Sequence, residues 1–125
     1  THEAAEASHA AGIAVMMGAP NVVRGGSHSG NVGARELAEH GLLDILSSDY
    51  APVSLLHAAC LLADLPAIGG LPGAIRLVTL DPARAVGLED RGAIAIGRRA
   101  DLVRITLADG MPVVREVYRE GLRVA

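Results

Sequence analysis

The sequence predicts an α/β fold: the last βα units of a (β/α)8 barrel over residues 1–90, followed by a small antiparallel β unit over residues 91–125. Short apolar runs alternate with helix-like segments in the first part, which is typical of βα units around a parallel sheet. After residue 91 the pattern changes to β-rich runs separated by turns. Because a barrel needs eight strands and only two are predicted here, we expect the carboxyl-terminal part of a barrel rather than a complete one.

The first helix and strand are predicted from adjacent segments. Glu3–Ala11 is rich in alanine and is followed by Gly12, which indicates a helix that ends at a glycine. Thr1 is a suitable cap for its start. The continuous apolar run Ile13–Met17 predicts a strand that is buried on both faces, as in a parallel sheet.

The next βα unit follows a long segment of turn-forming residues. Gly18–Gly33 reads GAPNVVRGGSHSGNVG and is predicted to be a loop. A short helix is expected over Ala34–His40, a second buried strand over Leu42–Leu46, and an apolar helix over Val53–Ala63.

The rest of the chain is predicted to contain two helices and then antiparallel strands. The helices are expected over Leu71–Leu80 and Pro82–Val86, with Asp81 capping the second one because it precedes a proline. The expected β segments are 91–97, 100–107, 112–119 and 122–124. Asp109–Gly110 between two apolar runs predicts a hairpin turn.

The composition excludes several classes of protein. Half of the 125 residues are hydrophobic and the net charge is -3, so a disordered chain is excluded. A single cysteine excludes a disulfide scaffold and is compatible with the cytoplasm. The absence of basic runs and the 2% aromatic content argue against nucleic-acid binding, and no apolar stretch is long enough for a membrane span. Because the sequence starts without methionine, we expect a piece of a longer protein.

Asp49 is the strongest catalytic candidate. It follows the predicted strand Leu42–Leu46 in the segment Ser47-Ser48-Asp49, and the carboxyl ends of barrel strands build active sites. A carboxylate there could bind a divalent metal or accept a proton from metal-bound water. A turn or helix-cap carboxylate is the equally weighted structural alternative.

The glycine-rich loop is the second candidate site. Its polar residues are mostly hydrogen-bond donors, and its glycines let backbone N–H groups approach an oxyanion. The candidate ligand contacts are Asn21, Arg24, Ser27, His28, Ser29 and Asn31. The alternative, a surface loop of turn-forming residues, is slightly favoured by sequence alone. The other histidines and Cys60 are expected to be structural, since no paired metal-ligand spacing is present.

Three segments together resemble the carboxyl-terminal part of enzymes of the amidohydrolase superfamily. They are Met17-Gly18-Ala19-Pro20-Asn21, the run from Arg24 to Asn31, and Leu46-Ser47-Ser48-Asp49-Tyr50. Within the superfamily they resemble a diphosphatase branch of phosphonate metabolism, in the carbon–phosphorus lyase pathway. The segments around Asp81–Leu88 and Ala100–Val103 look like the general superfamily tail, which closes the barrel and enters a small β-sandwich. The resemblance therefore implies that residues 91–125 are strands of that sandwich.

The resemblance implies a metal-dependent phosphohydrolase. Asp49 would match the aspartate after the eighth strand, which binds a divalent metal, zinc or manganese, and handles the proton of the attacking water. The donors of the loop would contact the polyphosphate of a small-molecule substrate. The upstream half of the barrel, which carries the other metal ligands, is absent from this sequence, so the chain alone is expected to be inactive and to bind metal weakly.

Two other interpretations remain open. The chain could belong to an amidohydrolase that cleaves a C–N bond, resembling deacetylases or dihydroorotases, although the donor-rich loop suits phosphates better. It could also be a non-catalytic α/β module that associates with a second copy through exposed sheet edges.

Overall fold

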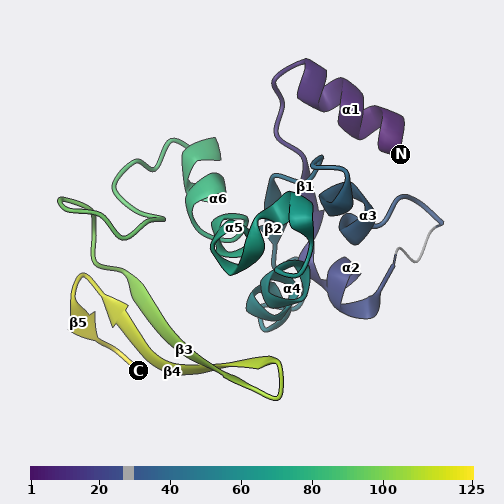
Figure 1. Cartoon of the computed structure of the whole chain (residues 1–125). Coiled ribbons are helices and arrows are strands. Elements are labelled where there is room, and N and C mark those ends of the chain that lie inside the picture. The colour runs from purple at the N-terminus through teal and green to yellow at the C-terminus, as the bar shows by residue number, and fades with distance from the viewer. Residues whose placement is uncertain (27–29) are drawn as a thin grey trace.

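The computed structural model describes residues 1–26 and 30–125 and is a mixed α/β structure (Figure 1). Two short parallel strands, β1 (Met16–Gly18) and β2 (Ile45–Ser47), form one sheet. A separate antiparallel sheet contains β3 (Leu102–Ala108), β4 (Met111–Arg119) and β5 (Leu122–Arg123) in that order. The predicted change from parallel to antiparallel strands along the chain is therefore present.

Helices surround the parallel pair, and the antiparallel sheet lies to one side of them (Figure 1). In chain order they are α1 (His2–Ala10), α2 (Ala19–Arg24), α3 (Ala34–Glu39), α4 (Ser54–Leu62), the 3-10 turn η1 (Pro66–Ile68), α5 (Gly70–Arg76) and α6 (Leu80–Ala85). Helix α4 contacts both α2 and β4, so it joins the helical part to the second sheet.

The first helix forms as its sequence predicts. The Thr1 side chain accepts a hydrogen bond from the Ala4 amide at 3.3 Å, which satisfies one of the free N–H groups of the first turn. Gly12 follows the helix with φ +71°, a left-handed conformation that a glycine adopts without steric cost.

The parallel strands are shorter and more exposed than predicted. Met16 pairs with Ile45 and Gly18 with Ser47. Strand β1 was expected to be buried on both faces, but Met16 is 60% exposed and Ile13, which precedes the strand, is 61% exposed. The reason is that the sheet has only two strands. On the other edge of β2, the Leu46 amide donates to the Leu77 carbonyl at 2.9 Å.

The core is made of small and branched aliphatic side chains. Leu37 of α3 and Leu62 of α4 are its largest fully buried side chains. Ala19, Ala34 and Ala58 are completely buried, and their small size lets the helices approach closely. A core without phenylalanine or tryptophan is what the composition predicts.

Two helix predictions were wrong. The segment predicted as one loop begins with α2, which follows an extended Gly18 and has Pro20 in its first turn, a position where proline's missing N–H costs nothing. Asp81 was predicted to cap a helix that begins at Pro82, but α6 begins at Leu80, so Asp81 lies in its first turn. The Asp81 carboxylate instead accepts a hydrogen bond from Arg76 at 2.9 Å.

The antiparallel sheet has the predicted turn but one strand fewer than expected. Asp109 (φ +51°) and Gly110 (φ +78°) both have the left-handed backbone of a two-residue turn between β3 and β4. The expected β segment over residues 91–97 is irregular, with a bend at Gly92 and a turn at Gly97. Just after this segment, Arg99 pairs with Asp101 at 2.8 Å and with Glu120 at 3.2 Å, and these two ion pairs connect it to residues that flank the sheet strands.

Among the described residues, none of the helices has the length and apolar content that crossing a membrane requires.

Candidate functional site

Asp49 lies just beyond the carboxyl end of β2, beside the carboxyl end of β1. Its backbone has φ +51°, in the left-handed region that aspartate tolerates better than most residues. A Cβ atom added to Gly18 would stand 3.0 Å from the Asp49 Oδ2 atom and 3.3 Å from its Cβ. The missing side chain at Gly18 therefore leaves the space that the Asp49 carboxylate occupies. Asp49 is exposed, so the carboxylate is accessible to a ligand.

Asn21 connects helices α2 and α3 through a side-chain hydrogen bond. Its Oδ1 atom accepts a hydrogen bond from the Ala34 amide at 2.8 Å, at the start of α3. The side chain thus joins α2 to α3 across the segment between them and supplies an acceptor to a free N–H of α3. Its predicted contact with a ligand stays a prediction, and so does that of Asn31, which is exposed.

Arg24 is directed to the residue that follows Asp49. It is the last residue of α2, which ends at Gly25 with φ +79°. The guanidinium carbon lies 5.6 Å from the centre of the Tyr50 ring, and Nη1 donates a hydrogen bond to the Tyr50 hydroxyl. Among the described residues no carboxylate pairs with Arg24. The arginine is thereby oriented while its charge stays available to an anion.

Three predicted contacts, Ser27, His28 and Ser29, lie outside the described residues. The segments on either side of them are Gly25–Gly26 and Gly30–Gly33. These segments lead on to Arg24 on one side and to Ala34 on the other, both of which the structure describes.

The described residues do not by themselves fit a metal site. Nowhere in residues 1–26 and 30–125 do three or more histidine, cysteine, aspartate or glutamate side chains come together to hold an ion. Asp49 is one potential ligand, and a catalytic zinc normally takes three from the protein. The expected metal would need further ligands from elsewhere.

A cavity of about 630 Å³ lies beside the Arg24–Tyr50 pair. It is bordered by α2, by the segment from Tyr50 into the first turns of α4, and by the β4 end of the hairpin. Its wall is mostly apolar, and its ionisable side chains besides Tyr50 are Arg24 and His57. The sequence did not indicate this cavity, because its walls come from three segments far apart in the chain.

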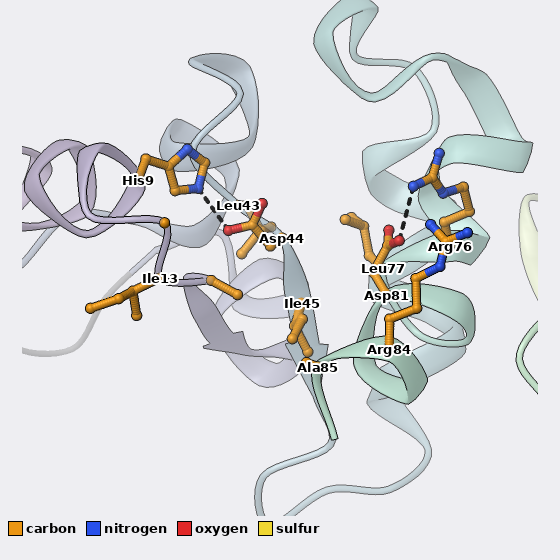
Figure 2. Close-up of a pocket in the computed structure, with 12 residues that line it drawn as sticks. His9, Ile13, Leu43, Asp44, Ile45, Arg76, Leu77, Asp81, Arg84 and Ala85 are labelled. Carbon is orange, nitrogen blue, oxygen red and sulfur yellow. Dashed lines mark hydrogen bonds and ion pairs between the residues drawn. The ribbon is translucent and has the colours of Figure 1, made fainter. Parts of the chain in front are cut away.

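A second cavity, of about 560 Å³, lies at the opposite ends of the two strands (Figure 2). On one side His9 Nε2 and Asp44 Oδ2 are 2.7 Å apart, and the same Oδ2 atom accepts the Val15 amide at 2.7 Å. On the other side, Arg76 and Asp81 pair. No predicted site residue lines this cavity. His9 was expected to be structural, and its contact with Asp44 was not predicted because the two residues lie far apart in the sequence.

Comparisons with known proteins agree with the resemblance. A family model described as "Amidohydrolase family" matches residues 2–124. The chain is 58% identical over 125 residues to an Escherichia coli protein named alpha-D-ribose 1-methylphosphonate 5-triphosphate diphosphatase, covering 99% of the chain and 33% of the relative. An imidazolonepropionase of Deinococcus deserti is 33% identical over 72% of the chain and 26% of the relative.

A third relative, an adenine deaminase of Ligilactobacillus salivarius, is 67% identical over a shorter stretch, 42% of the chain and 9% of the relative. The chain spans a third or less of the length of these relatives. No solved structure was found to match the chain significantly.

Proposed function

This chain belongs to the amidohydrolase family, and from that premise we propose that it is part of a metal-dependent hydrolase of phosphonate metabolism. The proposed reaction cleaves α-D-ribose 1-methylphosphonate 5-triphosphate to the 5-phosphate and pyrophosphate. The observation that carries the proposal is the 58% identity to the E. coli diphosphatase over 99% of the chain. In this proposal residues 1–90 are the last βα units of a barrel, and 91–125 are strands of a sandwich.

Asp49 is the proposed catalytic residue of this part of the enzyme. In the reaction, the oxygen of a water molecule bonds to the α-phosphorus, the bond from that phosphorus to the bridging oxygen breaks, and pyrophosphate leaves with the bridging oxygen. The carboxylate of Asp49 accepts the proton of the attacking water. This role is supported by the position of Asp49 beyond the end of β2, where Gly18 leaves room for the carboxylate.

The anionic groups of the substrate are proposed to contact the donors after β1. The proposed contacts are Asn21, Arg24, Ser27, His28, Ser29 and Asn31. Support for Arg24 is its oriented guanidinium, which no described carboxylate neutralises. Charge-assisted hydrogen bonds of this kind are about twice as strong as neutral ones.

The isolated chain is proposed to be inactive. The described residues offer Asp49 but no group of three metal ligands, so the remaining ligands of a zinc or manganese ion would come from the rest of a longer, cytoplasmic protein. Purified chain should hold metal weakly and release no pyrophosphate from the triphosphate. Robust turnover by the chain alone would contradict this part of the proposal.

A chimaera tests the function directly. In it, this chain replaces the matching segment of the E. coli diphosphatase. We expect the chimaera to release pyrophosphate, and the Asp49→Asn variant to lower kcat by about a hundredfold or more. Asp109→Asn is a matched control, because Asp109 has the same φ of +51° in the β3–β4 turn. A folded chimaera without activity, or one that Asp49→Asn leaves unchanged, would refute the proposal.

A second candidate function is hydrolysis of a C–N bond. It is favoured by the adenine deaminase relative, which is 67% identical over 42% of the chain. The shorter coverage makes it the weaker candidate. Release of ammonia from adenine by the same chimaera, without release of pyrophosphate from the triphosphate, would favour it.

A further inference from the structure

The cavity beside Tyr50 combines one fixed cation with an apolar wall. Arg24 lies over the Tyr50 ring and donates to its hydroxyl. Most of the other side chains that line the cavity are apolar, among them Val53, which is 90% exposed, and Met111, which is 47% exposed. Side chains of this kind gain free energy when a ligand covers them. A volume of about 630 Å³ is in the range of small-molecule sites.

The basic side chains that line the cavity favour an anionic ligand. No carboxylate is among its lining residues, whereas Arg24 is permanently cationic and His57 can become so. The tyrosine contact restricts the arginine side chain before a ligand arrives, and such ordering lowers the entropy cost of binding. A ligand that fits must therefore place a negative charge on Arg24 and an apolar group against the wall.

Few phosphate-like groups carry both a negative charge and an apolar substituent on the phosphorus. A phosphate ester exposes oxygen atoms on every side, and each of them would lose its water against Val53 and Met111. A methylphosphonate ester has one negative charge and one methyl group on the same phosphorus. Its methyl group can cover the aliphatic wall while its oxygens accept from Arg24.

We propose that this cavity is the subsite for the methylphosphonate end of the substrate, and that the β3–β4 hairpin supplies part of its wall through Met111. The identity of the ligand rests on the proposed function. Arg24 then holds the end of the substrate that does not react, rather than the triphosphate. Asp49, the proposed catalytic residue, directly precedes Tyr50 in the chain and does not itself line the cavity.

Tyrosine fluorescence gives a direct test on the isolated chain. Tyr50 and Tyr118 are its two tyrosines and it has no tryptophan, so a Tyr118→Phe background reports on Tyr50 alone. The two probes are ethyl methylphosphonate and ethyl phosphate. Ethyl phosphate carries the higher negative charge near neutral pH and would bind tighter if Arg24 alone decided. We expect the phosphonate to bind tighter, by about fourfold, because its methyl group is buried.

Two variants separate the contributions. Arg24→Gln should weaken both probes about tenfold, because it removes the charge. Met111→Glu should abolish the preference for the phosphonate, because it makes the wall polar and anionic. Arg115→Gln is the control, since Arg115 is an exposed arginine of β4 that does not line the cavity.

Each result decides the proposal. No saturable binding, tighter binding of ethyl phosphate, or equal effects of Arg24→Gln and Arg115→Gln would overturn the subsite. If the subsite fails while the chimaera releases pyrophosphate, the proposed function stands without it. If the chimaera is inactive while the phosphonate binds as expected, the subsite stands and the reaction is wrong.

Discussion

The carboxylate of Asp49 occupies space that Gly18 leaves open, so two residues from the ends of neighbouring parallel strands depend on each other. Gly18 pairs with Ser47 in the sheet, and Asp49 follows two residues later. Any side chain at Gly18 would meet the carboxylate at 3.0 Å, closer than a carbon and an oxygen normally approach. The contact with Asp49 therefore favours a glycine at this position, whereas its φ of -74° is one that other residues adopt as well.

Gly18→Ala should destabilise the chain by about 1–3 kcal/mol, because the added methyl group overfills the space beside Asp49. The measurement is urea unfolding of the single variants and of the double variant with Asp49→Ala. Asp49→Ala removes the Oδ2 atom that the methyl group would meet, so Gly18→Ala should cost less in that background. Equal costs in both backgrounds would show that the two residues are not coupled.

Replacing Leu62 by alanine should cost about 2–5 kcal/mol of unfolding free energy. Leu62 is completely buried where α4 packs into the core, so the change leaves a cavity. Leu61 is the adjacent residue of the same helix and is 37% exposed, which makes Leu61→Ala a matched control with a smaller loss. Chemical denaturation of both variants checks the difference, and similar losses would mean that α4 is rotated from its position here.

His9→Ala should lower the free energy of unfolding by about 1 kcal/mol, the usual worth of a partly exposed hydrogen bond. Asp44→Ala should cost more, because Asp44 also accepts the Val15 amide and so connects α1 to the starts of both strands. Asp64→Ala is the control: its pair with Arg35 is exposed at 3.4 Å and should contribute little. If Asp44→Ala costs no more than Asp64→Ala, the connection does not stabilise the fold.

The features that the sequence predicted are those set by neighbouring residues. The Thr1 cap and the Asp109–Gly110 turn depend on a few adjacent positions, and both are present. The contact between His9 and Asp44 spans 35 positions, and that between Arg24 and Tyr50 spans 26, so no local pattern indicates either of them.

The candidate site likewise contains one feature that neighbouring residues predict and one that depends on distant segments. Asp49 was singled out because an apolar strand precedes it, whereas the cavity beside Tyr50 exists only once the hairpin meets α4. The burial of Ile13–Met17 was predicted wrongly for a related reason. An apolar run favours burial, but the exposure of Met16 depends on how many strands the sheet contains.

The second sheet should lose stability in acid. Hydrogen bonding from Arg104 lowers the pKa of Glu116, with smaller contributions from Tyr118 and Arg123. The folded state therefore binds fewer protons than the unfolded state as the pH falls below the ordinary value of 4.5. The stabilisation is present above that pH and is lost as the pH falls through the lowered pKa. Urea midpoints at several pH values should show this, and Glu116→Gln should reduce the acid dependence more than Glu89→Gln, a change at an exposed glutamate.

Self-association is expected from the apolar face of the second sheet. Val103, Ile105 and Leu107 alternate along β3 and so share a face, and their partners across β4 are Val117, Val114 and Pro112. The opposite face carries the Arg104–Glu116 ion pair. Val114 and Pro112 also line the cavity beside Tyr50, whereas Val103 does not and is 57% exposed. A second copy can therefore cover apolar area around Val103 that the monomer leaves in water.

Sedimentation at micromolar concentrations should therefore show a mass that rises with concentration. Val103→Lys should shift the chain toward monomer, because a lysine in the middle of the face must be desolvated when two faces meet. Thr106→Lys, on the opposite face of the same strand, should leave the association unchanged. A wild-type chain that stays monomeric over this range, or equal effects of the two lysines, would show that this face does not drive association.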